Sequence, residues 1–288
     1  MTVSLPPPQD DGLYCQEVGP WSEDKHRLVL LYDRLFSTAM KGKWQTRVYI
    51  DLYSGPGLVR VRDARKFLWG SPVLALSVPD PFDKYIFCES NEEALAALRS
   101  RVEKLFPNAD VSYIAGDCNS KVDEICRAIP QHSMEHRVLS FCFADPYDLS
   151  IKFSTVRRLA DRFVDFLTLL AFGMDAARNW QLYLDPASKK VDAFLGFSDW
   201  RDRWAEEQTK GKVKFPQFLA QSYATQMELL NYLSVEFHQM KCIRSDVNNL
   251  PLYHLALFSR HKLAYTLWEQ VLKYSTDQGV MDFERREG

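Results

Sequence analysis

The chain has 288 residues, of which 46% are hydrophobic and 26% charged, and its formal net charge is -2. A chain of this length buries roughly 70 to 75% of its unfolded surface, which is enough for one large α/β domain or two small ones. The balanced charge excludes a strongly basic protein whose overall field attracts nucleic acid, and leaves open a local basic patch.

The cysteines and the apolar runs indicate the compartment. No C-x-x-C pair is present, and the cysteines are scattered through apolar or helical patterns, as expected for free thiols in a reducing compartment. No apolar run approaches the ~20 residues of a membrane span, and the N-terminus has neither the basic start nor the apolar core of a signal peptide. We therefore expect a cytoplasmic protein without a membrane segment, and the histidines show no spacing that predicts a metal site.

The first elements are one helix and one strand. Residues 1–19, rich in proline, are expected to form a loose N-terminal arm, and residues 20–288 a single domain. Leucines and aromatics recur at helical spacing over residues 25–40. Residues 47–53, "RVYIDLY", then read as a β-strand that ends at the turn Ser54-Gly55-Pro56-Gly57. A further helix is expected to open at Ser71 as N-cap, with Pro72 in its first position.

The middle of the chain alternates between strands and helices. The expected strands cover residues 84–90, 111–117, 137–147 and 164–173, and the expected helices between them cover residues 91–106, 120–129 and 155–163. Strands that alternate with helices and are almost uninterrupted in apolar residues are typical of a parallel sheet covered on both faces.

The last third departs from this alternation. Residues 174–214 mix aromatics with charge runs and are predicted to be an irregular helical insertion. A helix over residues 215–233, strands over 234–243 and 251–260, and a terminal helix over 261–275 follow. The sequence thus predicts an α/β fold, a doubly wound sheet with a C-terminal antiparallel β-hairpin and a helical insertion.

The carboxyl ends of the first four strands carry the candidate site, because ligands of doubly wound sheets bind there. These ends hold Asp51 with the glycine turn, Glu89, Asp117, and Asp145-Pro146-Tyr147. The third glycine of a dinucleotide fingerprint is missing, and four acids disfavour a pyrophosphate. A ligand with ribose, an adenine amine and net positive character fits better, and S-adenosylmethionine has all three.

Several stretches, in this order, resemble one family. "YIDLYSGPG", "GSPVLAL", "FCES", "GDCN" and "FADPYDLS" are similar to segments of the three-Cys-motif partner family, over about Trp21 to Trp268. That family is class I S-adenosylmethionine-dependent methyltransferase-like. The resemblance implies a Rossmann-like methyltransferase sheet and a separate partner protein that carries a three-cysteine motif.

The resemblance also implies cofactor contacts. Gly55 and Gly57, in the turn with Ser54, would lie against the amino-acid part of S-adenosylmethionine, with Asp51 orienting the loop or the ammonium. Glu89 would hold the ribose. Asp117 would accept a hydrogen bond from the adenine amine, and Cys118 and Asn119 would line that pocket.

Three further residues stand where methyltransferases of amino groups in nucleic acids carry [DN]-P-P-[YFW]. Asp145, Pro146 and Tyr147 would hold the acceptor, with the acid accepting from the target amine and the aromatic stacking on a base. One proline is absent, and Tyr147 comes one place early, while Asp148 replaces the glycine usual in the resembling family.

Alternatives remain for most of these features. The glycine turn is also compatible with an ordinary tight turn, and Glu89 and Asp117 with acids at helix N-termini. A basic stretch after the turn predicts contact with nucleic acid or an acidic partner, or else a solvated loop; it consists of Arg60, Arg62, Arg65 and Lys66.

Two functions follow. The first is an S-adenosylmethionine-dependent methyltransferase that acts on nucleic acid with a three-cysteine-motif partner. The alternative is a methyltransferase-like scaffold without catalysis that binds a cysteine-rich partner of the iron–sulfur type. The aromatic insertion would suit an interface or a local core.

Overall fold

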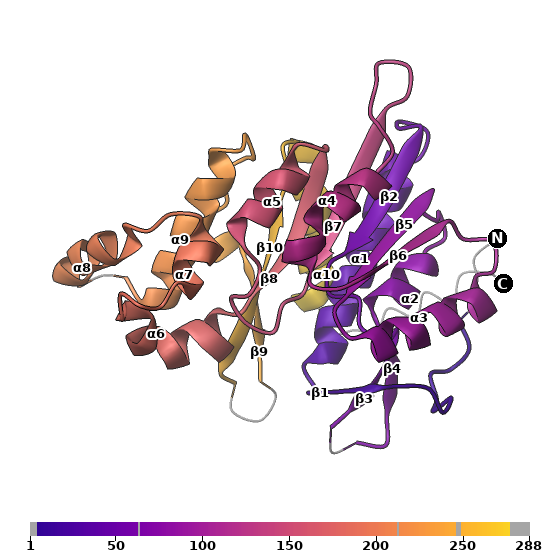
Figure 1. The fold of residues 1–288 in the computed structure, drawn as a ribbon, viewed down its shortest axis with the longest axis horizontal. Coiled ribbons are helices and arrows are strands. Elements are labelled where there is room, and N and C mark those ends of the chain that lie inside the picture. Colours follow the sequence, from indigo (N-terminus) through magenta and orange to yellow (C-terminus); the bar gives the residue numbers. More distant parts are fainter. Residues whose placement is uncertain (1–4, 63, 212, 246–248, 277–288) are drawn as a thin grey trace.

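The computed structural model describes residues 5–62, 64–211, 213–245 and 249–276. Its main element is a seven-stranded sheet (Figure 1) in the order β6-β5-β2-β7-β8-β10-β9. The strands are β2 (Thr46–Asp51), β5 (Lys84–Glu89), β6 (Val111–Ala115), β7 (Val138–Ala144), β8 (Val164–Leu170), β9 (Lys241–Arg244) and β10 (Pro251–Phe258). The first five strands of the sheet are parallel, and β10 is antiparallel to both β8 and β9.

Helices cover both faces of this sheet. One face carries α1 (Ser22–Met40), α2 (Ser71–Leu76), α3 (Glu92–Leu105) and α10 (Lys262–Thr276), and the other carries α4 (Cys118–Ala128), α5 (Phe153–Ala160) and α9 (Phe215–Glu228). Successive residues of a strand point to opposite faces, so Val48 and Ile50 pack in one core and Tyr49 in the other, all with no exposed surface. This explains the unbroken apolar runs, and the predicted fold class is confirmed.

The order of the strands creates a crevice. From β2 the chain moves outward through β5 to β6, and then returns to β7 on the other side of β2. The carboxyl ends of β2 and β7 therefore flank the topological switch point, where ligands of such sheets bind.

The insertion is helical, as predicted. It contains a π-helical turn over Phe172–Ala176, then α6 (Ala177–Leu184), α7 (Lys190–Leu195) and α8 (Trp200–Lys210). Phe194, Trp200 and Trp204 are at most 5% exposed and belong to the same core as α9. These aromatics form a local core, which was one of the two interpretations of the sequence.

The basic stretch after the glycine turn is not a simple loop. It forms β3 (Leu58–Val61) and β4 (Phe67–Trp69), and β1 (Gln16–Val18) pairs with β3 in a separate three-stranded sheet. Residues 13–19 of the expected loose arm thus include a strand. The Asp11 carboxylate also pairs with Arg101 of α3, at 2.6 Å.

Two local predictions are wrong. The N-cap of α2 is Gly70, and Ser71 is inside the helix because its hydroxyl donates to Asp51 instead of capping the helix. Residues 234–240, predicted as the start of a strand, contain a 3₁₀ turn over Phe237–Gln239, and β9 begins only at Lys241. Part of the turn between the two last strands, residues 246–248, lies outside the described residues.

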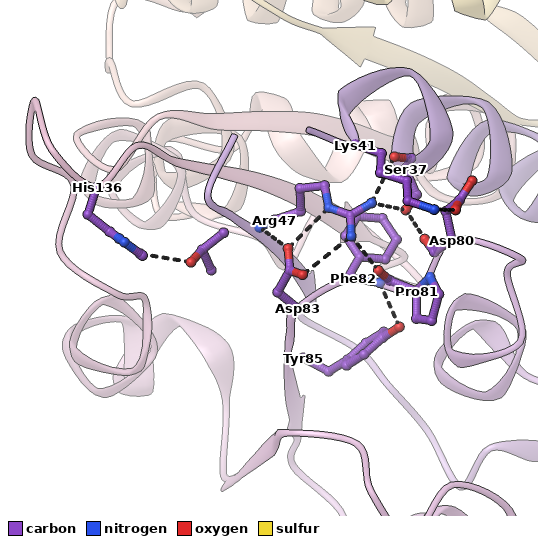
Figure 2. Close-up of polar contacts among 10 residues, drawn as sticks. Ser37, Lys41, Arg47, Asp80, Pro81, Phe82, Asp83, Tyr85 and His136 are labelled. Carbon is purple, nitrogen blue, oxygen red and sulfur yellow. Dashed lines mark hydrogen bonds and ion pairs between the residues drawn. The ribbon is translucent and has the colours of Figure 1, made fainter. Parts of the chain in front are cut away.

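A buried arginine fastens the amino end of β2 (Figure 2). The Arg47 guanidinium donates to the Asp83 carboxylate at 3.1 Å, to the Pro81 carbonyl at 2.7 Å and to the Ser37 carbonyl at 2.9 Å. These bonds join α1, β2 and the segment before β5, at the edge of the sheet opposite the crevice. Arg47 and its partners therefore lie away from the crevice.

Candidate functional site

A cavity of about 520 Å³ lies at the switch point. Its walls come from the turn after β2, from Glu89 at the end of β5, from Asp145 after β7, and from the segment around β1. The sequence predicted the first three walls. The fourth comes from the N-terminal segment, which the sequence did not place near the site.

The two glycines of the turn have different surroundings. Both have positive φ, +60° at Gly55 and +79° at Gly57, a region that side chains rarely adopt. A Cβ on Gly57 would lie 2.7 Å from Leu98 Cδ1 and 3.1 Å from Val73 Cγ2, so this glycine allows two helices to pack closely. A Cβ on Gly55 would meet only Gln16 Oε1, at 3.6 Å, and therefore would enter the cavity.

Asp51 supports the turn from below. It has no exposed surface, accepts from the Ser71 hydroxyl at 2.6 Å and from the Tyr53 amide at 3.1 Å, and does not line the cavity. Burial raises the pKa of Asp51 to about 7, against the lowering effect of these two hydrogen bonds. Of the two roles expected for Asp51, its position suits the orientation of the loop.

Glu89 holds the turn from the side. One carboxylate oxygen accepts from the Gly55 amide at 2.8 Å, and the other accepts from the Asn91 amide, also at 2.8 Å. The oxygen bonded to Asn91 also accepts from the Ser90 hydroxyl at 3.3 Å, whereas the oxygen bonded to Gly55 keeps a second lone pair that can accept from a ligand. Glu89 lines the cavity. The Glu89 side chain thus both shapes the wall and offers an acceptor to a hydroxyl group.

Asp117 and Cys118 follow β6, the strand that pairs with β5. Asp117 is the N-cap of α4 and accepts from the Asn119 amide at 3.0 Å, which is the capping role considered from the sequence. Cys118 is 2% exposed, and burial raises the pKa of its thiol to about 11. Neither residue lines the cavity, but the Gly116 amide, next to Asp117, donates to the Glu89 carbonyl at 2.9 Å, so both residues follow the strand beside Glu89. Their contact with an adenine stays a prediction.

The segment after β7 faces the cavity through Asp145, Pro146 and Tyr147. The Asp145 carboxylate forms an ion pair with the Lys25 ammonium of α1, in which the two side chains are 20% and 10% exposed. The Tyr147 ring is 65% exposed, and its hydroxyl accepts from the side-chain amide of Gln16. Residues far apart in the chain thus meet at this wall.

Three residues of the cavity wall have a buried polar atom without a hydrogen-bond partner in the described structure. The atoms are the Tyr53 hydroxyl, Ser54 Oγ and His26 Nδ1. Burial lowers the pKa of His26 to about 3, so its ring is neutral and carries one donor and one acceptor. Unpaired buried atoms cost free energy, which a polar ligand in the cavity would recover.

Two ion pairs hold the loop that follows Tyr147. The Lys190 ammonium of α7 bonds to Asp148 at 2.7 Å and to Asp175 at 3.1 Å. Asp175 is 5% exposed and also accepts from the Leu149 amide at 3.0 Å. The insertion thereby holds the loop that carries Asp145, and Asp148 has a structural role that the sequence did not predict.

The basic residues of the β3–β4 hairpin are divided between two roles. Lys66 is paired with Glu23 at 2.6 Å, and Arg62 lines the cavity. Arg60 and Arg65 are exposed. No group of three or more His, Cys, Asp or Glu side chains that could hold a metal ion occurs among the described residues. Within the same ranges, no helix has the length and apolar character needed to cross a membrane.

No protein-family model matches the chain, and no curated protein sequence matches it. The resemblance to the three-Cys-motif partner family therefore stays a prediction. Solved structures of methyltransferases are similar to this chain at low sequence identity, and the roles of its residues rest on its own geometry.

Three of these structures are enzymes described with the cofactor or its product. Trm1 from Pyrococcus horikoshii, with S-adenosyl-L-methionine, has 10% identity and a TM-score of 0.45 over 88% of this chain and 58% of its own. The O-methyltransferase TomG from Streptomyces achromogenes, with SAM, has 12% identity and a TM-score of 0.43 over 82% and 79%. An O-methyltransferase from Bacillus cereus, with SAH, has 10% identity and a TM-score of 0.41 over 86% and 84%.

Proposed function

We propose that the protein is an S-adenosylmethionine-dependent methyltransferase. The observation that carries this proposal is the cavity at the switch point, where the missing Cβ of Gly55 leaves room for a ligand and Glu89 stands at its wall. A cavity of about 520 Å³ is within the 300 to 1,000 Å³ range typical of cofactor sites.

The residues present fit this cofactor. Glu89 can accept from a ribose hydroxyl through the lone pair that the Gly55 amide leaves free on its carboxylate oxygen. Ser54 Oγ and His26 Nδ1 have no hydrogen-bond partner in the described structure and could bond to polar groups of the cofactor. Arg62 is the cation of the hairpin that lines the cavity, and it suits the carboxylate of the amino-acid part.

The bound cofactor would supply a methyl group on a sulfonium. The residues of the chain would hold the acceptor atom in line with the sulfur–methyl bond, since alignment supplies much of the acceleration in such a displacement. Asp145 would accept from the acceptor's N–H or O–H group through lone pairs that Lys25 does not use. Lys25 fixes the direction of that carboxylate and is a positioning residue.

The finer proposal is that the acceptor is a nucleic acid base and that a three-cysteine-motif protein assists in the cytoplasm. Exposed Tyr147 at the mouth of the cavity suits stacking on a base, and exposed Arg60 and Arg65 suit phosphates. The six cysteines are free thiols, as the cytoplasm would require. Retention on nucleic acid that falls steeply with salt, and less in Arg60→Gln/Arg65→Gln, would support this acceptor class.

The experiment for the main proposal is calorimetric titration of the protein with S-adenosylmethionine, S-adenosylhomocysteine, NAD and ATP. We expect saturable binding of the two adenosyl ligands with sulfur, and at least about tenfold weaker binding in Glu89→Gln, because charge-assisted hydrogen bonds are lost. Binding of NAD or ATP without binding of either sulfur ligand would overturn the proposal.

A further inference from the structure

A second hollow lies beside the insertion, separate from the cofactor cavity. It measures about 680 Å³, and we call it the hairpin groove because residues within 237–244 and 250–254, around the β9–β10 hairpin, form much of its lining, together with residues of α6 and the start of α9. Figure 1 shows β9 and β10 running beside α6 and α9. Its apolar floor includes Phe237, Met240 and Leu252.

The groove and the cofactor cavity are neighbours. In the antiparallel pair of β10 and β8, His254 is opposite Leu170, the last residue of β8. The residues that precede His254 therefore lie at the carboxyl edge of the parallel strands. Leu252 and His254 line the groove, whereas Tyr253 between them lines the cofactor cavity. A ligand in the groove would be separated from the cofactor cavity by this part of one strand.

Cations surround the groove. Arg178, Lys214 and Arg244 are exposed residues of its lining, and no carboxylate occurs among the described residues that line it. Neither Arg178 nor Lys214 forms an ion pair with another part of the described chain. An apolar floor below cations that have no carboxylate partner among the described residues is complementary to a molecule with an apolar body and an anionic end.

A buried histidine adds a polar point to the floor. His254 is 8% exposed, and its Nδ1 has no hydrogen-bond partner within the described residues. Burial lowers the pKa of His254 to about 4, so the ring is neutral and one nitrogen can donate while the other accepts. The Phe237 ring lies on it, with the centroids 4.7 Å apart. A polar group on the body of the ligand would satisfy this nitrogen.

We propose that the hairpin groove binds a small amphipathic carboxylate whose apolar body carries a hydroxyl group. The carboxylate meets Arg178 and Lys214, the body lies on Phe237, Met240 and Leu252, and the hydroxyl bonds to His254. The volume suits a molecule of drug size. A single-stranded nucleic acid is less complementary, because it requires a polar track along its phosphates and this floor is apolar.

The test uses 3-(4-hydroxyphenyl)propanoate and 3-phenylpropanoate, titrated into the full chain by calorimetry. We expect saturable binding of the hydroxylated acid, and about tenfold weaker binding in Arg178→Gln/Lys214→Gln, since hydrogen-bonded ion pairs are lost. Lys104→Gln/Arg127→Gln is the matched control, because it removes the same two residue types from exposed positions outside the groove. Its affinity should equal that of the wild type.

Two further variants test the lining of the groove and the contact with the hydroxyl group. Leu250→Glu places a carboxylate at an exposed position of the lining and should also weaken binding. His254→Phe should abolish the preference for the hydroxylated acid, about fivefold in the wild type for one hydrogen bond, and leave the affinity for 3-phenylpropanoate.

Three results would overturn the proposal. The first is equal binding by the groove variant and the control variant, and the second is no binding by the folded wild type. The third is binding of decathymidylate, weakened by Arg178→Gln/Lys214→Gln, without binding of either acid, which would assign the groove to nucleic acid.

Discussion

The Lys25 ammonium of α1 is paired with the Asp145 carboxylate that follows β7, although the two residues are 120 positions apart in the sequence. Both side chains are at most 20% exposed, so each neutralises a charge that would otherwise be largely buried. The first helix thereby sets the direction of the acid that we assign to the acceptor.

Lys25→Met should lower the free energy of unfolding by about 3 kcal/mol, because it leaves Asp145 without its counter-ion in a poorly solvated site. Lys25→Met/Asp145→Leu should recover a large part of that loss, and urea unfolding of the complete double-mutant cycle measures the coupling. The control is Lys41→Met, which breaks a pair whose lysine is 64% exposed and should cost less than about 1 kcal/mol. Additive effects in the Lys25–Asp145 cycle would refute the coupling.

Gly57→Ala tests the packing role of the second glycine. The new Cβ would lie 2.7 Å from Leu98 Cδ1, at a φ of +79°, so we expect a loss of about 3 kcal/mol in urea unfolding from strain and overpacking together. Gly42 has a similar φ of +72° and nothing within 4 Å of a Cβ. Gly42→Ala should therefore cost only about 1 kcal/mol, and equal losses in the two variants would contradict the crowding at Gly57.

Asp51 should make stability depend on pH. Its pKa is raised from 3.8 to about 7 in the folded protein, so folding favours the protonated form. The stability that this provides is present below pH 3.8 and is lost as pH rises through 7. Relative to Asp51→Asn, the wild type should lose about 4 kcal/mol of unfolding free energy over this range, since each unit corresponds to about 1.4 kcal/mol. Parallel stability curves of the two proteins would contradict this shift.

Lys190→Met tests the link between the insertion and the loop after β7. Asp148 and Asp175 lose their shared ammonium, and Asp175 is almost fully buried, so we expect a loss of about 2 kcal/mol in urea unfolding. The neighbouring Lys189 is 73% exposed and 3.4 Å from Asp192. Lys189→Met should change stability by less than about 0.5 kcal/mol, and a similar effect of both substitutions would remove the special role of Lys190.

The sequence predicted the main sheet because its strands are buried on both faces and read as unbroken apolar runs. It did not predict β1, β3 and β4, since strands of three or four residues show too little periodicity to be recognised. Residues 234–238 alternate polar and apolar residues but run into a 3₁₀ turn over Phe237–Gln239, so the pattern alone was misleading there.

The site could be predicted only in part, because local patterns in the sequence report the ends of strands but not tertiary contacts. Gly55, Glu89 and Asp145 lie at or just beyond the carboxyl ends of β2, β5 and β7, and the topology of the sheet brings these ends together. Asp117 also follows a strand, but its side chain caps α4 instead of facing the cavity. Lys25 reaches the site by tertiary packing across the fold, and no local pattern in the sequence reports such a contact.

The most direct test of the cofactor site is the dissociation constant for S-adenosylmethionine in the wild type and in Gly55→Asn. Asparagine tolerates the positive φ of this position, and its side chain would enter the cavity. Our assignment predicts at least about thirtyfold weaker binding, equivalent to 2 kcal/mol, with an unfolding midpoint close to that of the wild type. Equal affinity in two equally stable proteins would show that the cofactor does not bind against Gly55, and would contradict the assignment.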